Sequence, residues 1–174
     1  HHCGSLAAVD GISLAAVCDL DIAKADAYAE QFNVPAFRDY REMLHSVGDI
    51  DIAAVITPSG MHYEHGMEML ADFGKHVIME KPTFMRPDQL TEAWDAAQKN
   101  GLKLFPVFQN RYNKAVRRVR EGILNGELGA VRIGSIFLRP PMRDRHVGLL
   151  MLAAASVGKA EGAYNQPVCM RLAQ

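Results

Sequence analysis

The sequence is poor in the features that mark secreted and membrane proteins. Its 174 residues include only three cysteines, Cys3, Cys18 and Cys169, with no CxxC pair, which argues against a disulfide framework and fits a reducing compartment. The longest mostly apolar run covers residues 147–158, well short of the roughly 20 residues that a membrane helix needs. No N-terminal signal segment is visible. We therefore expect a cytoplasmic protein without a membrane span.

An excess of charge of one sign is also missing. Lysine and arginine number 19 against 20 acidic residues, which gives a formal net charge of -1. Bulk charge therefore gives no reason to expect a nucleic-acid or membrane partner. The hydrophobic share of 49% and the charged share of 22% are ordinary for a soluble globular protein. The length suits one large domain, or one domain and part of a second.

What the sequence does contain is a regular alternation of apolar runs and amphipathic segments. The runs predict buried strands at residues 12–19, 51–57, 76–80 and 102–108, with a short extended piece at 35–37. The segments between them carry helix caps and stops and predict helices at residues 21–32, 39–46, 61–73 and 86–101. Such alternation indicates βαβ units, and hence a parallel sheet covered on both faces. Right-handed crossovers make this a doubly wound α/β fold.

The pattern changes after the last of these strands. An amphipathic helix at 113–129 and a further strand at 130–138 are expected next, so we place a domain boundary near Gln109. The remaining residues have neither clear helix caps nor a clean period. The chain is therefore divided into segments 1–108, 109–138 and 139–174.

Asp19 stands at the carboxyl end of the first strand, where open α/β sheets bind their ligands. A carboxylate there can accept hydrogen bonds from both ribose hydroxyls of an adenine nucleotide, and it repels a 2′-phosphate. Alternatively Asp19 only caps the following turn, as Asp21 also could. The next residue is Leu20 rather than an arginine, so no cation is expected for an extra phosphate. This favours NAD over NADP.

Thr57, Pro58 and Ser59 end the next strand, and His62 begins the helix behind them. Such a turn offers backbone N–H groups and a hydroxyl to a pyrophosphate or a ribose. It is equally an ordinary strand-to-helix turn in which proline fixes φ. His62 and His65 share a helix face, but no carboxylate or cysteine supports them at metal-ligand spacing. We expect solvated histidines there and no metal.

The stretch GKHVIMEKP, residues 74–82, ends a strand on two opposite charges and a proline. Lys81 is placed at the ligand-binding edge of the sheet. A partly desolvated lysine gives up its proton more readily, so it can hold a substrate hydroxyl and help to move its proton while hydride leaves. Glu80 could orient Lys81 or contact the nicotinamide ribose, and Pro82 rigidifies the turn. The alternative is a surface ion pair of little energetic value.

Four segments together resemble the Gfo/Idh/MocA (glucose-fructose oxidoreductase / inositol dehydrogenase) family. They are AAVCDLD, AAVITPSGMHYEHGMEML, GKHVIMEKP and LFPVFQNRYNKAVRRVREGILNGELGAV, in this order. The likeness extends from the N-terminus to about Leu138, and Glu-Lys-Pro is its most specific part. It implies a Rossmann-type NAD(P)-binding domain over 1–108, with 109–138 as the beginning of an α+β substrate domain. NAD is the implied cofactor, with NADP possible.

The resemblance also assigns roles to particular residues. It implies that Lys81 is catalytic and binds the reacting hydroxyl. The cofactor-binding residues that it implies are Asp19, Thr57, Pro58, Ser59, His62, Glu80, Lys81 and Pro82. The substrate-binding residues that it implies are Lys81, Gln109, Asn110 and Arg111. The residues of these segments are most similar to those of members that act on nucleotide-linked amino sugars, such as UDP-N-acetylglucosaminuronate 3-dehydrogenases. The resemblance also implies that the full-length form is a homo-oligomer.

The sequence departs from this family in two places. Members begin with a strand and a G-x-G-x-x-G turn, whereas this chain begins at HHCGSLAAVDG, which corresponds to the helix after that turn. The family's Gly-Gly…His motif is not found after Leu138. We therefore expect a fragment of a dehydrogenase that transfers a hydride between a nicotinamide cofactor and a secondary alcohol of a sugar, cyclitol or nucleotide sugar, with weak cofactor binding and little turnover. The alternative is a non-catalytic nicotinamide-binding or partner-binding protein.

Overall fold

The computed structural model describes residues 2–6, 8–132 and 168–172. The chain divides into two compact units, one formed by 1–107 with 164–174 and the other by 108–163, and each is described by itself. In the first unit the elements follow in the order α1 (His2–Leu6), β1 (Ile12–Cys18), α2 (Ile22–Phe32), β2 (Ala36–Phe37), α3 (Tyr40–Ser46), β3 (Ile52–Val55), η1 (Ser59–Met61), α4 (His62–Ala71), β4 (His76–Met79), α5 (Pro87–Lys99), β5 (Leu104–Pro106) and β6 (Val168–Leu172).

The strands form one sheet with the order β2-β1-β6-β3-β4-β5. The neighbouring pairs β1–β2, β3–β4 and β4–β5 are parallel, which confirms the predicted doubly wound α/β class. The strand β6 was not predicted. It lies between β1 and β3 and runs antiparallel to both, so the sheet is mixed at its centre.

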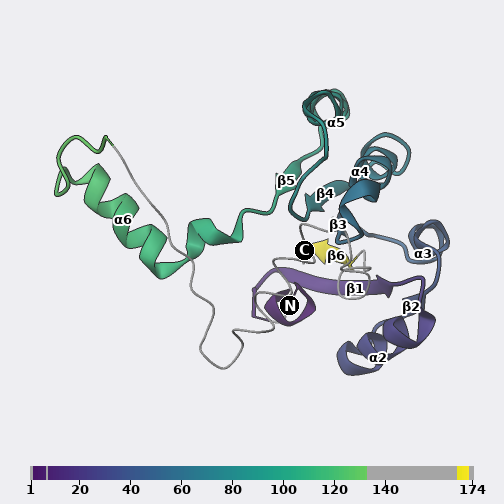
Figure 1. Ribbon diagram of the computed structural model, residues 1–174. Coiled ribbons are helices and arrows are strands. Elements are labelled where there is room, and N and C mark those ends of the chain that lie inside the picture. The colour runs from purple at the N-terminus through teal and green to yellow at the C-terminus, as the bar shows by residue number, and fades with distance from the viewer. Residues whose placement is uncertain (1, 7, 133–167, 173–174) are drawn as a thin grey trace, which may run out of the picture. The chain divides into compact units, whose positions relative to one another are not determined.

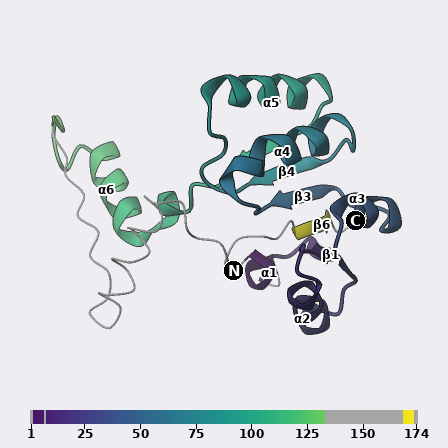
Figure 2. The ribbon, with the colours of Figure 1, turned by 45° about the vertical axis from the view of Figure 1, so that its right-hand side comes forward.

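Helices cover both faces of the sheet, as Figures 1 and 2 show. One face packs against α3, α4 and α5, through a core that includes Met43, Met69, Leu70, Ala93 and Ala97. The other face packs against α1 and α2, through a core that includes Cys3 and Ala25. Strand residues alternate between the two cores as the two-residue period of a strand requires. In β3, Ala53 and Val55 face one core while Ile52 and Ala54 face the other.

The helix ends follow the local signals in the sequence. The Asp39 carboxylate accepts hydrogen bonds from the N–H groups of Arg41 and Glu42, at 2.7 and 3.1 Å, which makes it the cap of α3. Asp21 occupies the same position before α2, but its side chain makes no capping hydrogen bond. Gly74 has φ +62°, the left-handed conformation in which glycine commonly ends a helix segment.

The second unit, where the structure describes it, contains η2 (Gln109–Tyr112) and α6 (Lys114–Leu124). The side chain of Asn113 accepts a hydrogen bond from the N–H of Ala115 at 2.9 Å and so caps α6. The helix ends before the predicted limit of 129, because Asn125 and then Gly126 with φ +74° redirect the chain. Of the strand expected at 130–138, residues 133–138 lie outside the described residues. The assignment of 109–138 to a substrate domain stays a prediction.

Within the described residues, no helix combines the length and the apolar character needed to cross a bilayer.

The packing of α4 on the sheet leads to a stability prediction. Leu70 is fully buried on α4, whereas Leu90 on α5 is 44% exposed. Leu70→Ala removes packed methyl groups and leaves a cavity, so we expect it to lower the free energy of unfolding by about 2–5 kcal/mol. Leu90→Ala is the matched control, with an expected loss of under about 1 kcal/mol. Urea unfolding of both variants measures the difference, and equal losses would contradict the packing of α4 described above.

Candidate functional site

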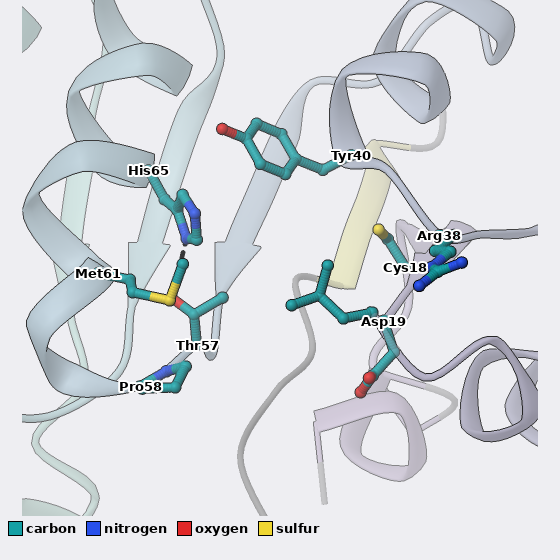
Figure 3. Close-up of a pocket in the computed structure, with 9 residues that line it drawn as sticks. Cys18, Asp19, Arg38, Tyr40, Thr57, Pro58, Met61 and His65 are labelled. Atoms are coloured by element: carbon teal, nitrogen blue, oxygen red, sulfur yellow. Dashed lines mark hydrogen bonds between the residues drawn. The ribbon is translucent and has the colours of Figure 1, made fainter.

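A pocket opens at the carboxyl edge of the sheet, between the ends of β1 and β3 (Figure 3). Its volume is about 120 Å³. Its lining comes from two groups of residues that are distant in sequence: Cys18, Asp19, Leu20, Arg38 and Tyr40 on one side, and Thr57, Pro58, Met61 and His65 on the other. The edge at which parallel strands end is where open α/β sheets bind ligands. The structure therefore brings the predicted residues Asp19, Thr57 and Pro58 together.

Asp19 has one carboxylate oxygen that is engaged and one that is not. Its Oδ1 accepts a hydrogen bond from the N–H of Asp21 at 2.8 Å, so the turn-capping alternative is correct for this oxygen. Its Oδ2 is buried and has no hydrogen-bond partner, although the residue is only 2% exposed. A buried carboxylate oxygen without a donor is costly. The ribose hydroxyls of an adenine nucleotide would supply such donors, so Asp19 fits the adenosine part of a nucleotide cofactor.

The other wall of the pocket is held by a chain of contacts through His65. The Nδ1 of His65 lies 3.1 Å from the hydroxyl of Thr57, and its ring packs edge-on against Tyr40 with 5.1 Å between the ring centroids. Burial lowers the pKa of His65, although the carboxylates of Glu64 and Glu68 oppose the shift. The imidazole is therefore neutral at pH 7, and the wall carries no charge at this point.

Tyr40 is fixed from behind by a carboxylate on α4. Its hydroxyl donates to Glu68 Oε2 at 2.5 Å, and the guanidinium of Arg41 donates to both oxygens of Glu68, at 2.5 and 2.7 Å. Burial and the bond to Glu68 raise the pKa of Tyr40. Burial acts to raise the pKa of Glu68, but the hydrogen bonds from Arg41 and Tyr40 outweigh it and keep this pKa below its ordinary value. This network ties α3 to α4 across the two sides of the pocket.

His62 links the pocket turn to the turn that carries Lys81. Its Nε2 lies 2.7 Å from the carbonyl oxygen of Thr57, and its Nδ1 lies 2.7 Å from the carbonyl oxygen of Pro82. Carbonyl oxygens only accept, so the neutral ring donates to one of them and the protonated ring donates to both. The side chain is 1% exposed and His65 is 9% exposed, so the expectation of solvated histidines is wrong. Both ring nitrogens are engaged inside the protein, and the ring acts as a brace.

The described residues contain no group of three or more histidine, cysteine, aspartate or glutamate side chains that could hold a metal ion.

Glu80 stabilises the turn after β4. Its Oε2 accepts a hydrogen bond from the backbone N–H of Lys81 at 2.8 Å, and its Oε1 lies 3.0 Å from His2 Nε2 on α1. The carboxylate therefore orients Lys81 through the main chain. The peptide bond between Lys81 and Pro82 is cis.

Lys81 itself is exposed at the sheet edge. The partial desolvation on which its proposed acid–base role depends is thus not provided by the described residues around it. Gln109, Asn110 and Arg111 form η2 of the second unit and are exposed there. Their convergence with Lys81 stays a prediction.

The sequence reasoning missed the contribution of β2 to the pocket. Arg38 and Tyr40 line it, because Phe37 pairs with Cys18 in the parallel register of β1 and β2. The rule that carboxyl ends of parallel strands share an edge would have found them, had it been applied to the short extended piece at 35–37 as well. No local motif marks Met61, which enters the pocket from η1.

Comparison with known proteins gives a consistent result. A family model described as "Oxidoreductase family, NAD-binding Rossmann fold", GFO_IDH_MocA, matches residues 1–108. The D-glucoside 3-dehydrogenase of Escherichia coli (strain K12) is 37% identical over 123 residues, which are 70% of this chain and 34% of that protein.

Two solved structures are similar to the chain. One is the WlbA dehydrogenase of Bordetella pertussis in complex with NADH and UDP-GlcNAcA, with TM-score 0.67 and 30% identity over 74% of this chain and 39% of the other. The second is KijD10, a 3-ketoreductase from Actinomadura kijaniata, as its Y186F mutant in complex with TDP-benzene and NADP. It has TM-score 0.61 and 26% identity over 68% of this chain and 36% of the other. The chain thus spans between a third and two-fifths of the length of these relatives.

The brace formed by His62 can be tested by its removal. His62→Ala removes a buried ring that contacts the carbonyl groups of Thr57 and Pro82 and opens a small cavity, so we expect a loss of about 2–4 kcal/mol in the free energy of unfolding. The matched control is His45→Ala, which removes an exposed histidine that contacts one carbonyl on its own helix; a loss under about 1 kcal/mol is expected. Urea unfolding compares the two, and a loss for His62→Ala as small as that of the control would refute the brace.

The lowered pKa of His65 leads to a prediction about pH. In the unfolded chain His65 titrates near its ordinary value of 6.5, and in the folded protein it titrates lower, so the unfolded chain binds the proton more readily. Its contribution to stability is complete above about pH 6.5 and declines as the pH falls through that value toward the lower, folded pKa. We expect His65→Gln to lose less stability than the wild type between pH 7.5 and pH 5.5 (about one unit to either side of the ordinary pKa) in urea unfolding. An equal or steeper decline in the variant would contradict this.

Proposed function

The chain belongs to the Gfo/Idh/MocA oxidoreductase family with its NAD-binding Rossmann fold, and on that basis we propose that it binds a nicotinamide cofactor for hydride transfer. The substrate that we propose is a secondary alcohol of a sugar, a cyclitol or a nucleotide sugar, or the corresponding ketone. When bound, the cofactor supplies the hydride chemistry. The observation that carries the proposal is the buried, unpartnered Asp19 oxygen in a pocket at the carboxyl edge of the sheet.

The pocket provides for the adenosine end of such a cofactor. Asp19 accepts hydrogen bonds from the ribose hydroxyls, which removes the cost of its unpartnered oxygen. The apolar side chains of Leu20, Pro58 and Met61 suit the faces of an adenine ring. NAD is the cofactor proposed first, because a carboxylate at this place repels a 2′-phosphate.

The turn at residues 57–59 continues the site along the sheet edge. Ser59 begins η1, and α4 follows directly, so backbone N–H groups are available there to an anionic or polar group of the cofactor. His62 contributes by joining Thr57 to Pro82. This contact fixes the distance between the turn proposed to hold the cofactor and the turn that carries Lys81.

Lys81 is proposed as the residue that contacts the reacting hydroxyl. Its ammonium would lower the energy of the alkoxide that develops as hydride leaves. Gln109, Asn110 and Arg111 are proposed to bind the substrate from the second unit. The nucleotide-sugar ligand named for the WlbA structure supports a substrate of that class. A cytoplasmic homo-oligomer in the full-length form is part of the same proposal.

A second candidate function is cofactor binding without turnover. Two observations favour it: Lys81 is exposed, and the Glu80 carboxylate is engaged by His2 and by the backbone N–H of Lys81. Both functions require the same pocket, but only the dehydrogenase requires Lys81. A Lys81 variant therefore separates the two functions: only in a dehydrogenase should it lower the reaction rate while NADH binding stays nearly unchanged.

The test is a fluorescence titration with NADH, followed by a rate assay with NAD and a set of sugars and nucleotide sugars. Saturable NADH binding is expected, and Asp19→Ala should weaken it by about 10- to 100-fold, because hydrogen bonds to a carboxylate are lost. Lys81→Ala should leave NADH binding within about threefold yet lower the rate by about 10²- to 10⁴-fold, the usual worth of a positioned acid–base group.

The matched control is Lys103→Ala, which removes an exposed lysine at the opposite end of the sheet, just before β5, and should change neither quantity. Unchanged NADH binding in Asp19→Ala would contradict the proposed cofactor site. Normal NADH binding with no rate for any substrate would favour the second candidate function.

A further inference from the structure

Arg38 is a pocket residue to which neither the sequence motifs nor the proposed chemistry gives a role. It directly follows β2, and the N–H of Asp19 donates to the carbonyl oxygen of Phe37 at 3.1 Å. The parallel register of Cys18 with Phe37 therefore places Arg38 beside Asp19 at the same edge of the sheet. Figure 3 shows both side chains at one side of the pocket, across from Thr57 and Pro58.

The guanidinium of Arg38 has no polar partner within the part of the chain that the structure describes. Its side chain is exposed, and among the described residues it makes no hydrogen bond or ion pair. The other cations near this edge are engaged: Arg41 binds both oxygens of Glu68, and Lys24 lies 3.5 Å from the carboxylate of Asp21. Arg38 is also the one arginine or lysine in the pocket lining. It is thus available to an anionic ligand.

Without Arg38, this side of the pocket is acidic. Burial, together with the nearby carboxylates of Asp39, Asp19 and Glu42, raises the pKa of the Cys18 thiol to about 12. The carboxylate of Asp39 is directed at the N–H groups of α3 rather than at Arg38. A phosphate placed next to Asp19 would meet net negative charge, and the guanidinium is the group that offsets it.

We propose that Arg38 determines how the pocket treats the 2′-phosphate of NADP(H), so that the chain accepts NADP(H) as well as NAD(H). The inference rests on the proposed function, since it assumes the adenosine end of the cofactor in this pocket. A guanidinium pairs with phosphate oxygens through two parallel N–H donors, and it can stand beside the ribose that Asp19 holds. Asp19 and Leu20 alone favour NAD over NADP; Arg38, supplied by the neighbouring strand, offsets that preference.

The test is a pair of fluorescence titrations, with NADPH and with NADH, on the wild type, Arg38→Gln and Arg38→Lys. Arg38→Gln should weaken NADPH binding by about 10- to 100-fold, the range expected for hydrogen bonds to a charged group, and leave NADH binding within about threefold. Arg38→Lys should recover part of the loss, because a point charge remains without the bidentate geometry. Arg120→Gln on α6 is the matched control and should change neither affinity.

Other outcomes overturn the inference. Equal losses of NADPH and NADH in Arg38→Gln would mean that the side chain supports the adenine ring and not the phosphate. No loss of either, or wild-type binding of NADH with none of NADPH, would mean that Arg38 has no part in the choice of cofactor. The urea midpoint of Arg38→Gln should match the wild type, because the side chain is exposed.

Smaller probes separate this inference from the proposed function. Adenosine 2′,5′-bisphosphate and 5′-AMP report on the adenosine pocket alone, and isothermal titration calorimetry measures both. Tighter binding of the bisphosphate that is lost in Arg38→Gln supports the inference, even where no dinucleotide is turned over. Binding of NADH and 5′-AMP without any Arg38-dependent gain from the 2′-phosphate refutes the inference and leaves the proposed function standing. Absence of binding by all four compounds overturns both.

Discussion

The burial of β3 on both of its faces is the constraint on which the rest of the structure depends. All four of its residues are buried, with alternate side chains in the two cores. A strand in that position must also have its backbone groups paired on both edges, and β4 and β6 provide this pairing. Helices on both faces leave only the end of the strand open to a ligand. A ligand can therefore reach the turn at Thr57, which lines the pocket, but not the buried strand before it.

From this end the site is built by short links between turns. His62 connects the turn after β3 to the turn after β4, and Glu68 connects α4 to Tyr40 and Arg41 on α3. Each link uses a side chain of α4, so this helix sets the spacing of the whole edge. Tyr40 lies on the same side of the pocket as Asp19, so the link through Glu68 also joins the two sides of the pocket.

Periodicity predicted the alternating elements, because apolar runs and helix caps are local signals, and Asp19 and Thr57 followed from the rule about strand ends. What it could not predict depends on pairing between distant segments. Arg38 reaches the pocket through a two-residue strand, too short to give a period. The burial of His62 depends on a carbonyl group 20 residues away. The strand β6 carries no caps or spacing that would indicate its place between β1 and β3.

The position of β6 has a consequence for how the two sides of the pocket are held together. The two sides of the pocket belong to the two halves of the sheet, β2-β1 and β3-β4-β5, and β6 is the strand that joins them. Its partners β1 and β3 are far from it in sequence, and contacts of such long separation form slowly because a long chain loop must first be closed. A ligand that contacted both sides of the pocket would bind only the sheet in which this pairing is made, so it would stabilise that pairing by mass action. The affinity of such a ligand and the stability of the β6 pairing are therefore thermodynamically linked.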